Sequence, residues 1–217
     1  MAVITISREL GSAGSTIAER AARTLGYHFV DKRTIAEVLI QYGFVEFDKA
    51  YDSAPGFWAR FDSRRAEMVD LLDRVIQALA RHGDVVILGR GSFAVLAGFA
   101  DVLNVRIQAP LPVRIERVLE QPEITDPDQA EAILQESDRV RAAFVESFYG
   151  VRWDTATAFD VVIGTGKVSP DLAVTWLVEI VKALNERRAD GRTSRTIQVD
   201  PILAAAVCAV LECQVTH

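Results

Sequence analysis

Cysteine is scarce in this chain, and its scarcity excludes two kinds of architecture. The 217 residues include two cysteines, Cys208 and Cys213, which stand close together in an apolar segment near the C-terminus. Neither their number nor their spacing suits a disulfide framework or a zinc site. We therefore expect both to be buried or idle thiols.

Long apolar runs are missing as well. The longest one, residues 202–211, covers about ten residues, which is too short to span a bilayer. No basic leader precedes the first predicted strand, so a secretory signal peptide is not expected. These absences predict a cytoplasmic protein without a membrane partner.

Positive charge is in deficit. Lys and Arg number 24 against 30 Asp and Glu, which gives a formal net charge of -6. Such a balance argues against nucleic acid as a partner and leaves room only for local basic sites. What the chain does have is apolar residues, at 50% of the total, enough for one substantial core.

The N-terminal segment has the pattern of a phosphate-binding loop. A β-branched strand leads into a Gly/Ser-rich turn and then into a helix predicted over residues 16–25. In this arrangement, backbone N–H groups and a helix N-terminus converge on an anion. The motif G-x-x-x-x-G-K-[ST] also requires a lysine before its Ser or Thr. Here Ser15 precedes Thr16, and the first lysine in the chain is Lys32.

Short apolar strands alternate with amphipathic helices along residues 1–187. After the first strand, the pattern predicts strands at 27–31, 85–88, 102–108 and 160–164, and helices at 34–42, 63–81, 112–119, 126–148 and 169–184. This alternation predicts an α/β domain with one parallel sheet flanked by helices on both faces.

The composition changes beyond this domain. Residues 188–200 are polar and charged and are predicted to form a linker, whereas residues 201–217 are predicted to contain a short apolar helix with Pro201 in its first turn. This helix could dock on the core, contact a partner or form a homodimer interface.

Charged side chains follow several predicted strands, at the edge of the sheet where ligands bind in open α/β folds. These residues are Arg8; Asp31, Lys32 and Arg33; Arg90, which stands between two glycines; and Arg114 with Arg117. Each of them could equally be an ordinary surface residue. Their convergence on one sheet edge favours a site for an anionic ligand.

The long helix predicted at 126–148 adds further charges. Asp138 and Arg141 are three residues apart and share a helix face, whereas Arg139 points toward another face. One interpretation is a solvated helix with a weak ion pair. The other is a set of arginines presented to phosphates, whose oxygens fit the guanidinium fork.

Taken together, these residues resemble the cytidylate kinase-like family of nucleoside monophosphate kinases. The resemblance covers roughly residues 2–184 and depends on the following segments: Ile4–Gly14, Phe29–Lys32, Val86–Gly91, Arg114 with Arg117, Asp138–Phe144, Phe159–Asp160 and Gly164–Thr165. The combination is specific, although each segment alone is weak.

The resemblance implies a P-loop kinase fold with a small helical lid, and ATP-dependent phosphoryl transfer to a nucleoside monophosphate, with CMP or dCMP as the leading candidates. ATP and Mg²⁺ are the implied cofactors. The ATP phosphates would be held by Gly11, Ser12, Ala13, Gly14, Ser15 and Thr16, with Mg²⁺ at the hydroxyl of Thr16 or Ser15.

The same resemblance assigns the remaining site residues. Arg90 would hold the acceptor phosphate, Asp138 would lie near the acceptor base or orient Arg141, and Asp31 would lie near the acceptor or the metal. The lid side would be lined by Arg114, Arg117, Arg139 and Arg141.

The chain departs from the family pattern at several positions. Gly14 stands where cytidylate kinases have the loop lysine, so Arg8, Lys32 or a lid arginine would have to replace it, and we count Arg8 among the catalytic candidates. Gly91 stands where those enzymes have an acid, and Glu37 where they have an arginine, which leaves cytidine selectivity open.

Two alternative functions remain at this point. The missing lysine suggests a catalytically weak nucleotide sensor whose lid or C-terminal helix signals to a partner. The other alternative is a kinase whose acceptor is not a nucleotide.

Overall fold

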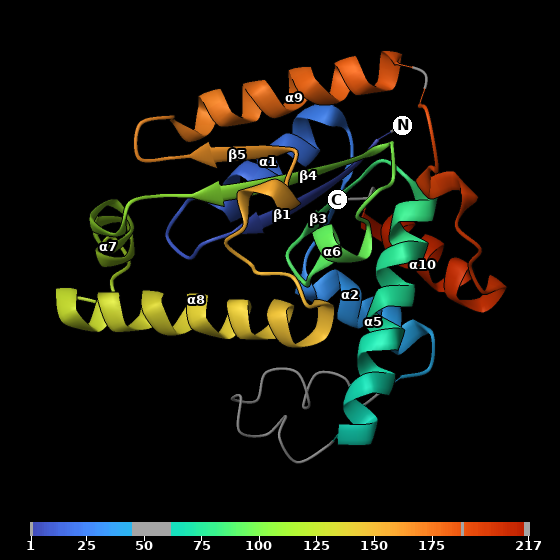
Figure 1. Ribbon diagram of the computed structural model, residues 1–217, viewed down its shortest axis with the longest axis horizontal. Helices are drawn as coiled ribbons and strands as arrows, with labels where there is room; N and C mark the ends of the chain where they lie inside the picture. Colours follow the sequence, from blue (N-terminus) through green and yellow to red (C-terminus); the bar gives the residue numbers. More distant parts are fainter. Residues whose placement is uncertain (1, 45–61, 188, 215–217) are drawn as a thin grey trace.

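The computed structural model describes residues 2–44, 62–187 and 189–214 (Figure 1). These residues form a five-stranded, fully parallel sheet with the strand order β2-β3-β1-β4-β5. The strands are β1 (Val3–Arg8), β2 (His28–Val30), β3 (Val85–Leu88), β4 (Val102–Gln108) and β5 (Val161–Gly164). The parallel α/β sheet expected from the sequence is confirmed.

Both faces of the sheet are covered, as the near-continuous apolar strands require. Ile4 and Ile6 of β1 face a core shared with α1 (Gly14–Leu25) and α9 (Pro170–Glu186). Val3 faces the opposite core, which contains residues of α2 (Lys32–Gln41), α5 (Asp62–His82) and α10 (Pro201–Gln214). Figure 1 shows α9 and α1 on one side of the sheet and α2, α5 and α10 on the other.

Two helices project from the carboxyl edge of the sheet. After β4 the chain forms α7 (Leu111–Leu119) and then the long α8 (Pro127–Tyr149), whose Leu134 is buried against Val118 of α7. In Figure 1, α7 lies beyond the tip of β4, and α8 runs back from it past the ends of the strands. This helix pair occupies the position expected for the lid. The short α6 (Ser92–Val95) follows β3.

The segment between α9 and α10 is held against the domain. Asp101 accepts hydrogen bonds of 2.7 Å from both the backbone N and the Oγ of Ser194, and the guanidinium of Arg192 lies 4.4 Å from the ring centre of Phe99. Ser194 belongs to a short 3₁₀ helix, Ser194–Thr196. The polar stretch predicted as a linker is therefore packed along the core.

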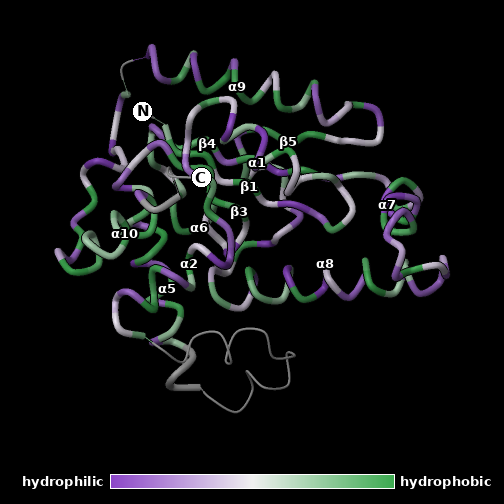
Figure 2. Tube along the Cα trace, turned by 180° about the vertical axis from the view of Figure 1, so that it is seen from behind, coloured by the Kyte–Doolittle hydropathy of each residue, from purple (hydrophilic) through white to green (hydrophobic). Residues whose placement is uncertain are grey.

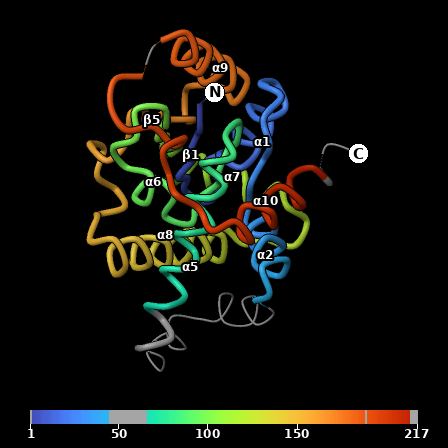
Figure 3. The backbone as a smooth tube through the Cα atoms, turned by 90° about the vertical axis from the view of Figure 1, so that its right-hand side faces the viewer, coloured from blue at the N-terminus to red at the C-terminus, as the bar shows by residue number. Residues whose placement is uncertain are grey.

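The C-terminal helix docks on this same core. Leu203, Val207 and Leu211 of α10 are buried, and the helix packs beside α2 and α5 (Figure 3). Figure 2 shows that α10 is apolar along most of its length. Of the three arrangements open at the sequence level, docking on the core is the one observed. In the part of the chain that the structure describes, no helix combines the length and hydrophobicity needed to cross a bilayer.

The edge strand β2 carries a histidine that should make stability depend on pH. The rings of His28 and His82 are 5.4 Å apart, edge to face. Burial lowers the pKa of His28 below its ordinary value and His82 lowers it further, while Asp84 acts in the opposite direction. Since the folded-state pKa is the lower one, the unfolded chain binds more protons.

We expect the stability contributed by neutral His28 to be present above a pH of about 6.5 and to be lost as the pH falls below it. The melting temperature of the wild type should therefore drop more between pH 7.5 and pH 5.5 than that of His28→Gln. Equal drops in the two proteins would contradict this assignment.

Candidate active site

The phosphate loop connects β1 to α1 and leaves a helix N-terminus open. Ala13 adopts a left-handed backbone conformation (φ 61°), and Gly14 is the first residue of α1. Among the described residues, no side chain caps this helix, and its first turn contains no acid. The side chains of Ser15 and Thr16 are exposed beside the unpaired N–H groups of this first turn. The loop therefore has the geometry and polarity of an anion site.

The side chains of Arg117 and Thr165 form hydrogen bonds to the backbone of the phosphate loop. Arg117 donates from Nη1 to the carbonyl oxygen of Gly11 (3.1 Å) and to Oγ1 of Thr165 (3.0 Å). Thr165, which directly follows β5, donates from the same oxygen to the carbonyl of Ser12 (2.8 Å). In this structure Arg117 is therefore bonded to the loop and to the residue that follows β5.

A buried ionic network links the loop to β4. Glu9 pairs through one carboxylate oxygen with Arg106 of β4 (3.2 Å), and through the other with Arg114 of α7 (3.4 Å). The side chains of Arg106 and Arg114 are 4% and 7% exposed. Arg106 also donates to the carbonyl of Trp153 (2.7 Å) and lies 4.4 Å from the centre of its ring. Glu9 is thus the counter-ion of two buried guanidinium groups.

The network continues from Arg114 to α8. Arg114 donates to the carbonyl of Leu10 (2.7 Å) and forms an ion pair with Asp138, which lies 3.7 Å from Arg141. Arg114 is therefore engaged by the loop and by α8. Asp138 therefore pairs with two arginines from two helices.

The arginines of α8 separate into two groups. Arg141 lines the large cavity described below and also donates to the hydroxyl of Ser137. Arg139 points outward, with a side chain that is 62% exposed and bonded to Glu136. The structure therefore brings Arg141 to the site and does not bring Arg139 there.

A cavity of about 840 Å³ opens between the phosphate loop, the ends of β2 and β3, and α8. Ser15 and Thr16 line one part of it, and Arg90 and Arg141 line another. Five aromatic side chains also line it: Phe29, Phe93, Phe144, Phe148 and Trp153. The volume and the mixed lining suit a small molecule that is both anionic and partly aromatic.

Arg90 is presented by a strained turn. Gly89, Arg90 and Gly91 follow β3 with φ values of 75°, 61° and 69°. A left-handed conformation costs a non-glycine residue about 1–2 kcal/mol, and strain of this kind is found at functional positions. Gly91 is required for a further reason, because a Cβ there would lie 2.3 Å from the ring of Tyr149. The turn thus directs a guanidinium to the cavity at a cost in stability.

The positive charges around the cavity affect one another. Burial lowers the pKa of Arg141, the charges of Arg114 and Arg90 lower it further, and Asp138 raises it. Arg8, Lys32 and Arg33 line the same cavity. A bound phosphate would relieve this repulsion, because guanidinium groups pair with phosphate oxygens.

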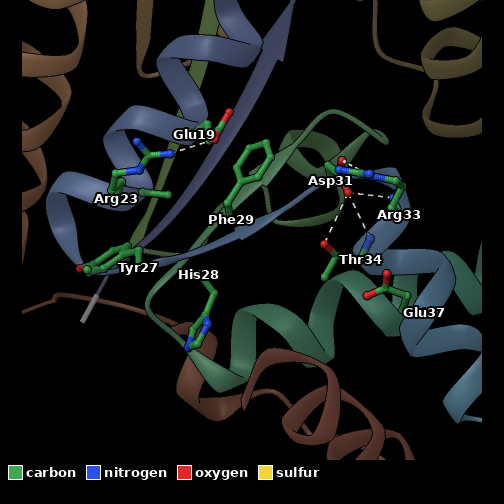
Figure 4. A pocket seen from close by; sticks show the side chains of 11 residues that line it. Glu19, Arg23, Tyr27, His28, Phe29, Asp31, Arg33, Thr34 and Glu37 are labelled. Carbon is green, nitrogen blue, oxygen red and sulfur yellow. Dashed lines mark hydrogen bonds and ion pairs between the residues drawn. The ribbon is translucent and has the colours of Figure 1, made fainter. Parts of the chain in front are cut away.

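Asp31 caps α2. It accepts hydrogen bonds from the backbone N–H groups of Arg33 (2.8 Å) and Thr34 (3.1 Å). Figure 4 shows it beside a second hollow of about 580 Å³, which lies along the edge strand β2. Asp31 and Phe29 line both hollows. The carboxylate therefore orients the start of α2 at the rim of the large cavity.

Comparison with known proteins identifies the family. The sequence model of the cytidylate kinase-like family matches residues 3–167. The chain belongs to this family. It is 26% identical over 195 residues to a cytidylate kinase from Halobacterium salinarum, covering 88% of this chain and 95% of that protein. It is 30% identical over 175 residues to a cytidylate kinase from Ignicoccus hospitalis, covering 80% of this chain and 95% of the relative.

A solved structure agrees with the fold of this cytidylate kinase-like chain. The crystal structure of an uncharacterized protein from Eubacterium ventriosum superposes with a TM-score of 0.68 at 22% identity, covering 84% of this chain and 98% of the other. The five-stranded parallel sheet with helices on both faces agrees with the fold that the resemblance to this family implied. Family and fold together support a kinase-type phosphotransferase.

Several residues of this family member's site escaped the sequence analysis. Arg106 pairs with Glu9 at the centre of the buried network, and its place as a charged residue within the apolar strand 102–108 was the available signal, because a buried charge needs a partner. Phe144 and Phe148 are two of the aromatic residues that line the cavity, and their sequence pattern indicated a helix and not a binding site. No group of three or more His, Cys, Asp or Glu residues that could hold a metal occurs in residues 2–44, 62–187 and 189–214.

Proposed function

We propose that this protein transfers the γ-phosphoryl group of ATP to a nucleoside monophosphate, with CMP or dCMP as the first candidates. One observation carries the proposal. One cavity is lined by the hydroxyls of the phosphate loop, by two arginines on the opposite side and by an aromatic wall, which consists of the five aromatic side chains named above. The names of the relatives reported above, which are cytidylate kinases, support the choice of acceptor.

The phosphate loop suits the donor. The N–H groups of the loop and of the first turn of α1 would bind the phosphates of ATP, and the uncapped helix would add a favourable dipole. A Mg²⁺ ion that arrives with ATP would neutralise part of its charge. Of the two exposed hydroxyls, Ser15 is the better metal ligand, because it follows Gly14, which stands at the lysine position of the motif.

The opposite side of the cavity suits the acceptor. Arg90 and Arg141 would bind the acceptor phosphate, since guanidinium groups pair with phosphate oxygens through two parallel hydrogen bonds. The aromatic wall would contact the base and the sugar. Closure of α7 and α8 over the site would exclude water and so prevent wasteful hydrolysis of ATP.

The reaction itself needs little covalent chemistry from the protein. An oxygen of the acceptor phosphate forms a bond to the γ-phosphorus while the bond to the β–γ bridging oxygen breaks, which yields ADP and a nucleoside diphosphate. Catalysis then depends on holding both substrates in line and on neutralising the transferring group.

ADP formation should be measured with Mg-ATP over a panel of nucleoside monophosphates. We expect turnover that depends on CMP or dCMP, and we expect Arg90→Gly to raise the acceptor KM at least tenfold. Since glycine tolerates the left-handed turn, this variant should be no less stable than the wild type. A panel without turnover, in a protein that binds ATP, would contradict the proposal and favour a nucleotide sensor or a different acceptor.

A further inference from the structure

The chain has an arginine and a glycine at two positions where the general phosphate-loop motif has a glycine and a lysine, respectively. With Gly14 at the lysine position of G-x-x-x-x-G-K-[ST], the second glycine falls on Ala13 and the first on Arg8. The backbone supports this register, because Ala13 has the positive φ of 61° that favours glycine. The chain therefore has a cation where the motif has its first glycine, and no side chain where the motif has lysine.

The arginine at position 8 sterically requires the glycine at position 14. A Cβ at Gly14 would lie 2.5 Å from Cβ and 3.0 Å from Cγ of Arg8. Neither contact is with the flexible end of a side chain, so Arg8 could not move aside without a shift of the backbone. A lysine at position 14 and an arginine at position 8 are thus incompatible in this loop.

The side chain of Arg8 runs from the end of β1 past Gly14 toward the end of β3. A Cβ at Gly89, which directly follows β3, would lie 2.3 Å from Nη1 of Arg8. Gly89 therefore has no side chain at the place where the guanidinium of Arg8 lies. Arg8 lines the large cavity together with Ser15, which would face the donor, and Arg90, which would face the acceptor. Arg8 therefore lines the same cavity as the residues proposed for the two substrates.

We propose that Arg8 supplies the positive charge that a P-loop lysine supplies elsewhere, and that Gly14 and Gly89 are glycines because this side chain crosses them. This inference rests on the proposed kinase function and names a catalytic residue for it. As the γ-phosphoryl group moves to the acceptor oxygen and the electron pair of the broken bond goes to ADP, Arg8 pairs with the phosphate oxygens of the donor. Arginine can hold two of these oxygens at once, which a lysine ammonium cannot do in the same planar geometry.

An exchange of the two side chains tests the proposal. We expect Arg8→Gly and Arg8→Ala to lower kcat at least 100-fold, within the range observed when one electrostatic donor is removed. Both variants should also weaken Mg-ATP binding about tenfold in calorimetry, as expected for the loss of a charge-assisted contact. Gly14→Lys alone should lose activity as well, because the new Cβ would collide with Arg8. The double variant Arg8→Gly/Gly14→Lys should regain at least tenfold in kcat over Arg8→Gly.

The control is Arg74→Ala, which removes an exposed arginine that pairs with Asp70 on α5 and should leave both readouts unchanged. Activity and Mg-ATP affinity of Arg8→Ala within threefold of an active wild type would overturn the inference and leave the proposed function intact. So would a folded double variant no more active than Arg8→Gly.

If the wild type phosphorylates no acceptor but binds Mg-ATP, the proposed function fails. The Mg-ATP affinities of the wild type and of Arg8→Ala then test whether Arg8 contacts the donor phosphates. A tenfold weaker affinity in Arg8→Ala would then support its contact with the donor phosphates, and an unchanged affinity would overturn it. A wild type that does not bind Mg-ATP would overturn both.

Discussion

Replacing Glu9 by alanine is expected to lower the free energy of unfolding by about 3–5 kcal/mol, the usual result of breaking a buried ion pair from one side. The carboxylate is the shared partner of Arg106 and Arg114, and it also accepts a hydrogen bond from the backbone N–H of Ala109 (3.1 Å). Without Glu9, Arg106 would keep a buried charge with no ion-pair partner among the residues that the structure describes. For a chain of this size, the melting temperature should fall by about 10 °C.

Urea and thermal denaturation of Glu9→Ala and Glu136→Ala provide the measurement and its matched control. The Glu136–Arg139 contact (2.7 Å) is shorter than the Glu9–Arg106 contact (3.2 Å), but it is exposed, so its removal should barely change the midpoint. In a double-mutant cycle, Arg106→Met should cost much less in the Glu9→Ala background than in the wild type. Similar losses from Glu9→Ala and Glu136→Ala would contradict the assignment of the network to stability.

Replacing Arg141 by alanine should lower kcat/KM for the acceptor about 100-fold to 1000-fold, the range for loss of one positioned electrostatic group. Arg141 lines the cavity beside Arg90, and burial and neighbouring positive charges lower its pKa. A bound phosphate is the group that would balance these charges. Because Asp138 orients Arg141 without reaching the cavity lining, Asp138→Asn should give a smaller loss of the same kind.

Arg139→Ala is the informative comparison, since family resemblance assigns both arginines to the lid. The structure directs Arg139 away from the cavity, into an exposed pair with Glu136. We therefore expect steady-state parameters within twofold of the wild type for Arg139→Ala under the same assay. Equal losses in Arg139→Ala and Arg141→Ala would mean that the working enzyme uses a different arrangement of α8.

The architecture and the phosphate loop could be predicted from the sequence because both depend on local patterns. Buried parallel strands require β-branched apolar runs such as Val85–Leu88, whose bounds agree with the prediction. The loop requires small residues at a strand-to-helix turn, and Gly11 and Gly14 indicated it. Helix α1 begins at Gly14 rather than at Thr16, because glycine and serine in a first turn give little local signal.

The roles of the arginines could not be predicted in the same way, since an arginine has the same chemistry in a cavity and in a buried ion pair. Arg114 and Arg117 belong to α7, one of the two helices at the position expected for the lid, yet they donate to carbonyl groups of the phosphate loop more than 100 residues away. The side chain of Arg8 has room for its position because Gly14 and Gly89 have no side chains. Gly89 follows a different strand, so this relation is not visible in the local sequence.

Sequence alone therefore determined the fold and the family, and it predicted the edge of the sheet at which the candidate site lies, because repeated local patterns specify them. Tertiary structure alone decided which positive charges face the cavity and which are held by Glu9 and Asp138. The physical reason is that the environment of a charge depends on partners from distant segments, and folding brings those partners together.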